Sequence, residues 1–182
     1  MAWMSRVVVV LLLFGVSVAM AADLVDFDAK ESKVVVTSPE FSGIAANTAR
    51  RRPPTAGAPG LEYLVFADSV RVAVVNHQWS ETPVSWPEID LVQYIGTVNP
   101  GGTLEKKIGA SAPYARGGAI GRLTQFSAHE GNEGVTCVAY GIKAVRNRVT
   151  GFICLPGTAP MTEDEARRLV NSVGVIGALP PA

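Results

Sequence analysis

The sequence predicts an α+β fold in which an antiparallel sheet of about five to six strands carries one central helix and one C-terminal helix. Three observations predict it. β-branched runs recur along the chain, two stretches show helical spacing of apolar residues, and the two cysteines lie where facing strands of a hairpin would place them. The 161 residues from Ala22 to Ala182 are enough for one domain with an ordinary core.

The first 21 residues have the three parts of a secretory signal peptide. Arg6 supplies the positive charge, residues 7–18 form an apolar run, and Ala19 and Ala21 are the small residues before a cut at Ala22. About twelve apolar residues are too few to span a membrane core that needs roughly twenty. We therefore expect cleavage after residue 21, a periplasmic or secreted protein, and no transmembrane segment once the signal is removed.

Three strands and one long loop are predicted in the first half of the remaining chain. Residues 33–37 are short and β-branched, and residues 61–66 and 70–78 form two more strands around a tight turn. Between the first and the second of these strands, over about residues 45–60, Pro and Gly are so frequent that we expect a flexible surface loop.

The second half is expected to hold both helices and three more strands. Ser85 and Glu88 have the spacing of a capping box with Pro87 in the first turn, which predicts the start of a helix. Residues 99–102 are expected to end this helix. Residues 103–118 show no sustained period and predict one helical turn followed by a loop. Strands are then expected over about residues 119–128, 135–143 and 149–155.

The C-terminal helix has the strongest local signature. Thr162 and Glu165 form a T-x-x-E capping box at its start, and Gly174 is a natural stop. Its apolar stripe follows the spacing i, i+3, i+4 and i+7 through Ala166, Leu169, Val170 and Val173.

Cys137 and Cys154 are predicted to form a structural disulfide rather than a metal or redox pair. An even cysteine count in an exported protein favours a bridge, and the spacing is not that of a C-x-x-C motif. Both cysteines are equally far from a point between Val145 and Arg146, so a hairpin turning there places them opposite each other. The same register pairs Val138 with Ile153, Ala139 with Phe152, Tyr140 with Gly151, and Ile142 with Val149.

The C-terminal third resembles small exported alphaproteobacterial proteins of unknown function. The residues that carry this resemblance are Cys137, the run from Gly151 through Phe152 to Cys154, and the capped helix that starts at Thr162. The order of strands followed by a helix is also similar to that of PsbP-like domains. Neither resemblance implies catalytic residues or a cofactor.

Residues with the chemistry of catalytic or metal sites are few and scattered. His77, His129, Glu130 and Glu133 are weak candidates for metal ligands, because nothing in their spacing requires them to converge. Motifs such as G-x-S-x-G and H-E-x-x-H are missing, and the Gly-rich residues 117–121 lead into a strand instead of a helix. We therefore expect no catalytic residues and no cofactor.

Two features could bind a partner. Arg50, Arg51 and Arg52 are the densest charge cluster, and they could dock an acidic partner or simply be solvated in a flexible loop. Trp79 and Trp86 could line a ligand groove or a partner-binding patch, or they could cover a corner of the core. The net charge is 0, with 16 basic and 16 acidic residues, so no strong field would attract nucleic acid.

These observations predict a non-catalytic, exported accessory domain that binds another envelope protein. A small-ligand-binding or metal-binding periplasmic protein is the alternative, and an enzyme is the more distant one. A deep, polar-lined pocket that converges on His77 or His129 would favour the ligand-binding alternative. An exposed arginine or aromatic patch without a pocket would favour the accessory role.

Overall fold

The structure is a computed structural model that describes residues 24–98, 105–130 and 133–182. The predicted signal peptide with its cleavage site, and the predicted helix stop at residues 99–102, lie outside these ranges. Within them, no helix has both the length and the apolar character to cross a membrane.

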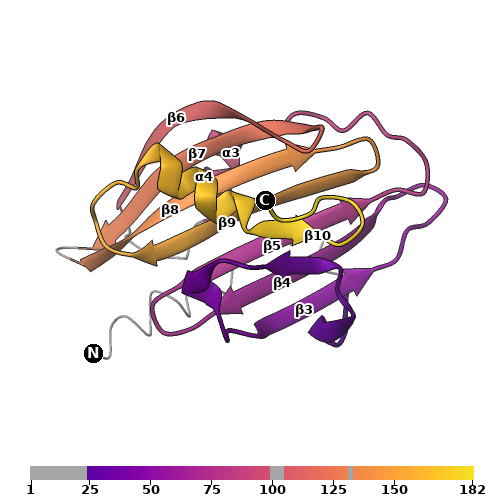
Figure 1. Cartoon of the computed structure of the whole chain (residues 1–182), viewed down its shortest axis with the longest axis horizontal. Coiled ribbons are helices and arrows are strands. Elements are labelled where there is room, and N and C mark those ends of the chain that lie inside the picture. The colour runs from indigo at the N-terminus through magenta and orange to yellow at the C-terminus, as the bar shows by residue number, and fades with distance from the viewer. Residues whose placement is uncertain (1–23, 99–104, 131–132) are drawn as a thin grey trace.

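An eight-stranded antiparallel sheet, called the main sheet below, forms the body of the molecule (Figure 1). Its strands lie in the order β1-β3-β4-β5-β9-β8-β7-β6. A second sheet of two strands pairs β10 (Val173–Val175) with β2 (Val34–Val36). The strands of the main sheet are β1 (Val25–Asp26), β3 (Ala46–Arg52), β4 (Gly60–Ala67), β5 (Val72–Trp79), β6 (Glu105–Arg116), β7 (Ala119–Glu130), β8 (Glu133–Lys143) and β9 (Asn147–Pro156).

The predicted sheet of five to six strands with a central helix is wrong. The described residues are mostly β, with eight strands in the main sheet, two in the small sheet, and only two short α-helices, α3 (Leu91–Thr97) and α4 (Glu163–Asn171). Figure 1 shows α4 and β10 in front of the main sheet and α3 behind it. We call the front side the α4 face and the back side the α3 face. Each face has its own hydrophobic cluster, one packed with α4 and one with α3.

Two strands occupy segments where a loop was expected. Half of the predicted flexible loop at residues 45–60 is strand, namely β3 and the first residue of β4, because β3 pairs with β4 with one irregularity between Ala46 and Thr48. Residues 105–116, predicted as a helical turn and a loop, are the edge strand β6, which pairs with β7. Residue 45 and the short connection between β3 and β4, residues 53–59, remain outside the main sheet.

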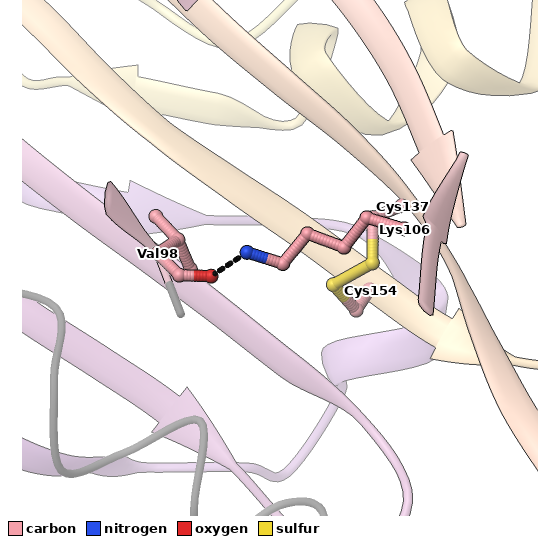
Figure 2. The surroundings of a disulfide bond; sticks show 4 residues. All are labelled: Val98, Lys106, Cys137 and Cys154. Atoms are coloured by element: carbon pink, nitrogen blue, oxygen red, sulfur yellow. Dashed lines mark hydrogen bonds between the residues drawn. A yellow bond between two sulfur atoms is a disulfide. The ribbon is translucent and has the colours of Figure 1, made fainter. Parts of the chain in front are cut away.

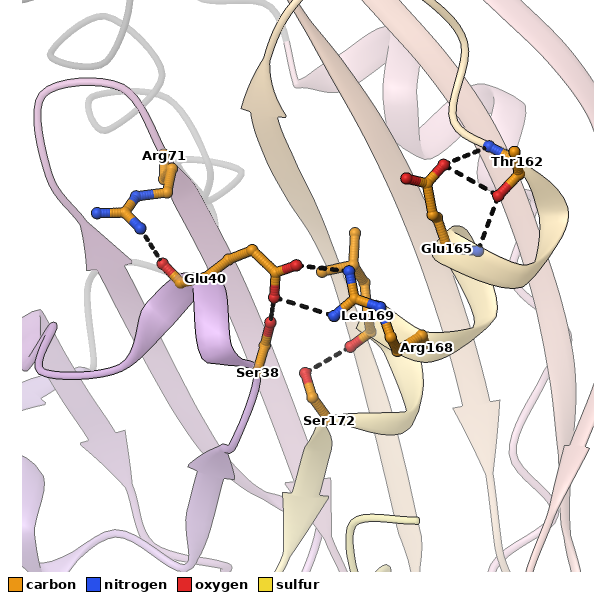
Figure 3. Close-up of polar contacts among 8 residues, drawn as sticks. All are labelled: Ser38, Glu40, Arg71, Thr162, Glu165, Arg168, Leu169 and Ser172. Atoms are coloured by element: carbon orange, nitrogen blue, oxygen red, sulfur yellow. Dashed lines mark hydrogen bonds and ion pairs between the residues drawn. The ribbon is translucent and has the colours of Figure 1, made fainter.

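The other predicted elements are present, with shifted ends. The central helix begins after Asp90, whose carboxylate accepts a hydrogen bond from the Gln93 amide at 3.0 Å, and not after Ser85. The capping box of α4 is confirmed (Figure 3). The Thr162 amide donates to Glu165 at 2.8 Å, and the Glu165 amide donates to the Thr162 hydroxyl at 3.2 Å.

The predicted disulfide and its hairpin register are both confirmed. Cys137 is bonded to Cys154 across β8 and β9, and the four residue pairs expected from the common midpoint are those of the structure. Tyr140 lies over Gly151, and its hydroxyl donates a hydrogen bond to the Val74 carbonyl at 3.1 Å. A side chain at Gly151 would begin 1.9 Å from that same carbonyl oxygen, so only glycine fits there.

The disulfide lies in the cluster on the α3 face, and both cysteines are fully buried. Figure 2 shows it beside Lys106 of β6, whose ammonium donates to the Val98 carbonyl at 2.7 Å. The same ammonium donates to the Ile95 carbonyl at 3.1 Å, so it satisfies carbonyls at the C-terminal end of α3. Burial lowers the pKa of Lys106.

On the α4 face, Glu40 joins the segment after β2 to α4 (Figure 3). Its carboxylate accepts a hydrogen bond from Arg168 at 3.0 Å and another from Ser38, and its carbonyl accepts one from Arg71. The hydrogen bond from Arg168 is the main reason why the pKa of Glu40 falls from 4.5 to about 2, against the opposing effect of burial.

This lowered pKa predicts how stability depends on pH. A carboxylate with a depressed folded-state pKa contributes stability above pH 4.5, and that contribution is lost as the pH falls toward 2. We expect Glu40→Gln to cost about 1 kcal/mol at pH 7, since solvent screens the half-exposed Arg168, and to cost almost nothing at pH 2. Urea unfolding at both pH values measures this. Glu88→Gln is the control, and a Glu40→Gln cost that persists at pH 2 would contradict the assignment.

Candidate functional site

A cavity on the α4 face lies where the main sheet meets the turn after β10. It has a volume of about 490 Å³ and is lined by residues from β3, β4, β5, the start of β9 and residues 175–178. We call it the His77 pocket, because His77 is at its floor.

Three polar side chains form the floor of the His77 pocket. The β4–β5 register places Glu62 directly opposite His77, and Asn147 begins the neighbouring strand β9. The His77 ring nitrogen Nε2 lies 2.9 Å from Oδ1 of Asn147, and its Nδ1 lies 3.6 Å from Oε2 of Glu62, beyond hydrogen-bond length. Glu62 is only 4% exposed and His77 only 3%, so both groups depend on these neighbours for solvation.

Arg51 completes the row on the β3 side. It pairs with Glu62 in the β3–β4 ladder, and its Nη2 lies 2.9 Å from the Glu62 carboxylate. The same guanidinium lies 3.7 Å from the Glu31 carboxylate and 3.9 Å above the ring of Phe27. Arg51 is therefore held by the fold and is not solvated in a flexible loop.

These contacts decide the charge state of Glu62. Burial by itself raises the pKa of this carboxyl group, but His77, the Ser32 hydroxyl and Arg51 together outweigh it and hold the pKa below its usual value. The Ser32 hydroxyl donates to Glu62 at 3.0 Å. Glu62 is thus an anion whose charge is already balanced by its protein neighbours.

Trp79 forms an aromatic wall of the His77 pocket. Its indole stacks on the His77 ring, with ring centroids 5.3 Å apart and planes at 25°. The other side of this corner is Gly60, where a β-carbon would lie 2.3 Å from the indole. The glycine therefore makes room for Trp79, which stays half-buried and lines the cavity.

Two basic residues lie at the mouth of the pocket. The Lys33 carbonyl accepts a hydrogen bond from the Ile176 amide at 2.8 Å, and the Arg146 carbonyl accepts one from the Ser80 amide at 3.0 Å. These backbone bonds fix both residues to segments that line the cavity. Both side chains belong to exposed residues, and within the described part of the chain neither forms an ion pair.

The other sequence candidates lie elsewhere. Trp86 is buried on the α3 face, beside a groove of about 800 Å³ that Arg148 also lines. Arg50 pairs with the exposed Asp26 at 3.1 Å, and Arg52 donates to the Pro59 carbonyl at 3.5 Å. The structure therefore separates Trp79 from Trp86, and only Arg51 of the arginine cluster lines the His77 pocket.

The weak metal candidates do not converge. The strand registers place His77 level with Val149, Ile142 and then Gly121 of β7, whereas His129 is eight residues further along β7. At about 3.3 Å per residue this separation is about 26 Å along the strands alone. His129 lies 3.2 Å from the Glu105 carboxylate, and the backbones of residues 130 and 133 are at that same distant end. Among the described residues, no group of three or more metal-ligating side chains forms.

Sequence reasoning missed Glu62 and Asn147. A signal for Glu62 was present, because the tight turn between β4 and β5 fixes the hairpin register and thereby places Glu62 opposite His77. Asn147 follows in the same way from the hairpin that aligns the cysteines, but only when the pairing of β9 with β5 is added.

Comparisons with protein-family models, with curated proteins and with solved structures give no match to this chain. The resemblance of the C-terminal third to small exported alphaproteobacterial proteins stays a prediction, and so does the similarity to PsbP-like domains. What the His77 pocket can bind therefore has to be inferred from its own residues.

Proposed function

We propose that this protein is an exported small-molecule-binding protein and that the His77 pocket is its binding site. The observation that carries the proposal is the row Glu62–His77–Asn147, which lies at the floor of an open cavity on the sheet face that also carries the apolar cluster packed with α4. Burying a carboxylate and an imidazole costs stability that apolar side chains would not cost. Packing alone does not explain why these polar residues are buried, whereas a role in ligand binding does.

The size and the lining of the pocket support the same proposal. Sites for small molecules are typically clefts of about 300–1,000 Å³ with apolar walls and a few placed polar groups. The His77 pocket has about 490 Å³, an indole wall, and a small number of polar and charged side chains among its lining residues. It also contains His77, one part of the criterion set above for ligand binding, although its walls are largely apolar.

The accessory role expected from the sequence stays a prediction. It was based mainly on the lack of a catalytic motif, the balanced charge and the structural disulfide. The arginine cluster was one candidate surface for it, and in the structure Arg51 is engaged with Glu62 and Glu31 and Arg50 with Asp26. Export is supported by the disulfide in the structure, since such bonds persist in oxidising compartments. N-terminal sequencing of protein from the cell envelope should find Ala22 first.

The binding proposal is tested by calorimetric titration with three probes of one shape and different charge: 2-naphthoate, 2-naphthamide and 2-naphthylmethylamine. We expect saturable binding of at least one of them. Trp79→Leu should weaken it about tenfold or more, because a stacked aromatic wall contributes on the order of 1 kcal/mol beyond area burial.

Trp86→Leu is the matched control, since the same substitution on the α3 face leaves the His77 pocket intact. It should lower stability without changing affinity. The proposal is wrong if none of the three probes binds saturably, or if Trp86→Leu weakens binding as much as Trp79→Leu does.

A further inference from the structure

We infer that the ligand of the His77 pocket is an organic monocarboxylate with a flat apolar body, an inference that rests on the proposed function. Its carboxylate is received at the mouth by Lys33 and Arg146, and its body lies against Trp79. The reason lies in which charges of the pocket are already paired within the protein and which are not.

The acidic groups of the pocket are both engaged by the protein. Glu62 contacts Arg51, Ser32 and His77, and Glu31 lies 3.7 Å from the same Arg51 guanidinium. Neither acid therefore needs a cationic ligand to balance it. A cationic ligand would instead compete with Arg51 for carboxylates that are already paired.

The cations are in excess. Besides His77, three lysine and arginine side chains line the cavity against two acidic ones, and the two that lack an ion pair among the described residues are Lys33 and Arg146. One negative charge on a ligand would therefore balance the lysine, arginine and glutamate side chains of the pocket. A monoanion balances this excess, whereas a phosphate dianion would exceed it.

The remaining walls set the rest of the ligand. Trp79 presents an aromatic ring, and Val175, Ile176 and Ala178 add aliphatic surface on the side of the β10 turn. Ile176 is 61% exposed, so the mouth itself carries an apolar group that a ligand can cover. A flat apolar body attached to the carboxylate would bury this surface against the indole.

The test compares the three naphthyl probes on the full chain and on variants that keep the fold. We expect 2-naphthoate to bind tightest, and Lys33→Gln/Arg146→Gln to weaken it about tenfold, the loss of roughly one charge-assisted hydrogen bond. Lys107→Gln, at an exposed position on β6 outside the pocket, is the control and should change nothing. Added salt should weaken 2-naphthoate and leave 2-naphthamide unaffected.

A second pair of variants places a negative charge at the mouth. Ile176→Glu should weaken the binding of 2-naphthoate but not of 2-naphthamide. Ile120→Glu, at a position of similar exposure outside this pocket, should change the binding of neither probe. Inorganic phosphate should fail to displace 2-naphthoate.

The inference is overturned if 2-naphthamide or 2-naphthylmethylamine binds tighter than 2-naphthoate, if the double variant behaves like Lys107→Gln, or if phosphate displaces 2-naphthoate. In each of these cases saturable binding that depends on Trp79 still supports the proposed function. If none of the three probes binds saturably, both the proposed function and this inference are wrong.

Discussion

Replacing both Cys137 and Cys154 with alanine is expected to lower the free energy of unfolding by about 3 kcal/mol. The bond closes a loop with a sequence separation of 17 residues, and in the chain-entropy model a loop of about this size contributes on the order of 3 kcal/mol. That is a large share of the roughly 5–15 kcal/mol that a folded domain has. Chemical unfolding of the two proteins, with midpoints and slopes compared, measures the loss.

The same bond should resist mild reductant while the protein is folded. Both cysteines have no exposed surface and lie in the cluster on the α3 face, so a thiolate cannot reach the sulfur atoms without local unfolding. Ligand binding should survive the double substitution, because the His77 pocket is on the opposite face. Rapid reduction of the native protein, or loss of binding in a variant that still folds, would argue instead for a redox role.

Arg51→Ala is expected to cost about 2 kcal/mol, and Arg50→Ala less than about 0.5 kcal/mol. The two arginines are adjacent on β3 but face different surroundings. Arg51 balances Glu62, whose side chain is only 6% exposed, whereas Arg50 pairs with Asp26, whose side chain is 85% exposed. Removing Arg51 leaves a buried carboxylate with weaker compensation.

Thermal unfolding of both variants, of Glu62→Gln and of Arg51→Ala/Glu62→Gln tests this explanation. The loss of stability in the double variant should be smaller than the sum of the losses in Arg51→Ala and Glu62→Gln. The reason is that neutralising Glu62 removes the charge that Arg51→Ala leaves unbalanced. Equal small effects at both arginines would contradict the assignment and support a solvated cluster.

The longer strands that sequence reasoning found have a buried face. The fully buried β10 was missed, because Val173 and Gly174 were assigned to the C-terminal helix and its stop, whereas α4 ends at Asn171. β5, β8 and β9 are rich in β-branched and aromatic residues, and the spacing of the two cysteines is enough to predict the β8–β9 register. The other two longer strands that it missed, β3 and β6, lack that pattern. β6 is an edge strand with most of its side chains exposed, and β3 carries arginines whose partners come from β4 and from the segment before β2.

The candidate site could be predicted only in part for the same reason. His77 and Trp79 were singled out individually, but the pocket needs β4, β9 and the turn after β10, which are far apart in the chain. Local patterns predict which residues lie on one strand. They do not predict that residues 175–178 return across the sheet to form a wall.

The most direct test of the central claim uses the fact that the chain has only two histidines. Their imidazole ring signals in a ¹H–¹³C NMR titration with 2-naphthoate report on two distant places, since His77 is at the pocket floor and His129 is at the other end of the sheet. If the His77 pocket is the binding site, the His77 signals shift saturably and those of His129 stay fixed. If the His129 signals shift and those of His77 do not, or if both shift together without saturation, the His77 pocket is not the binding site.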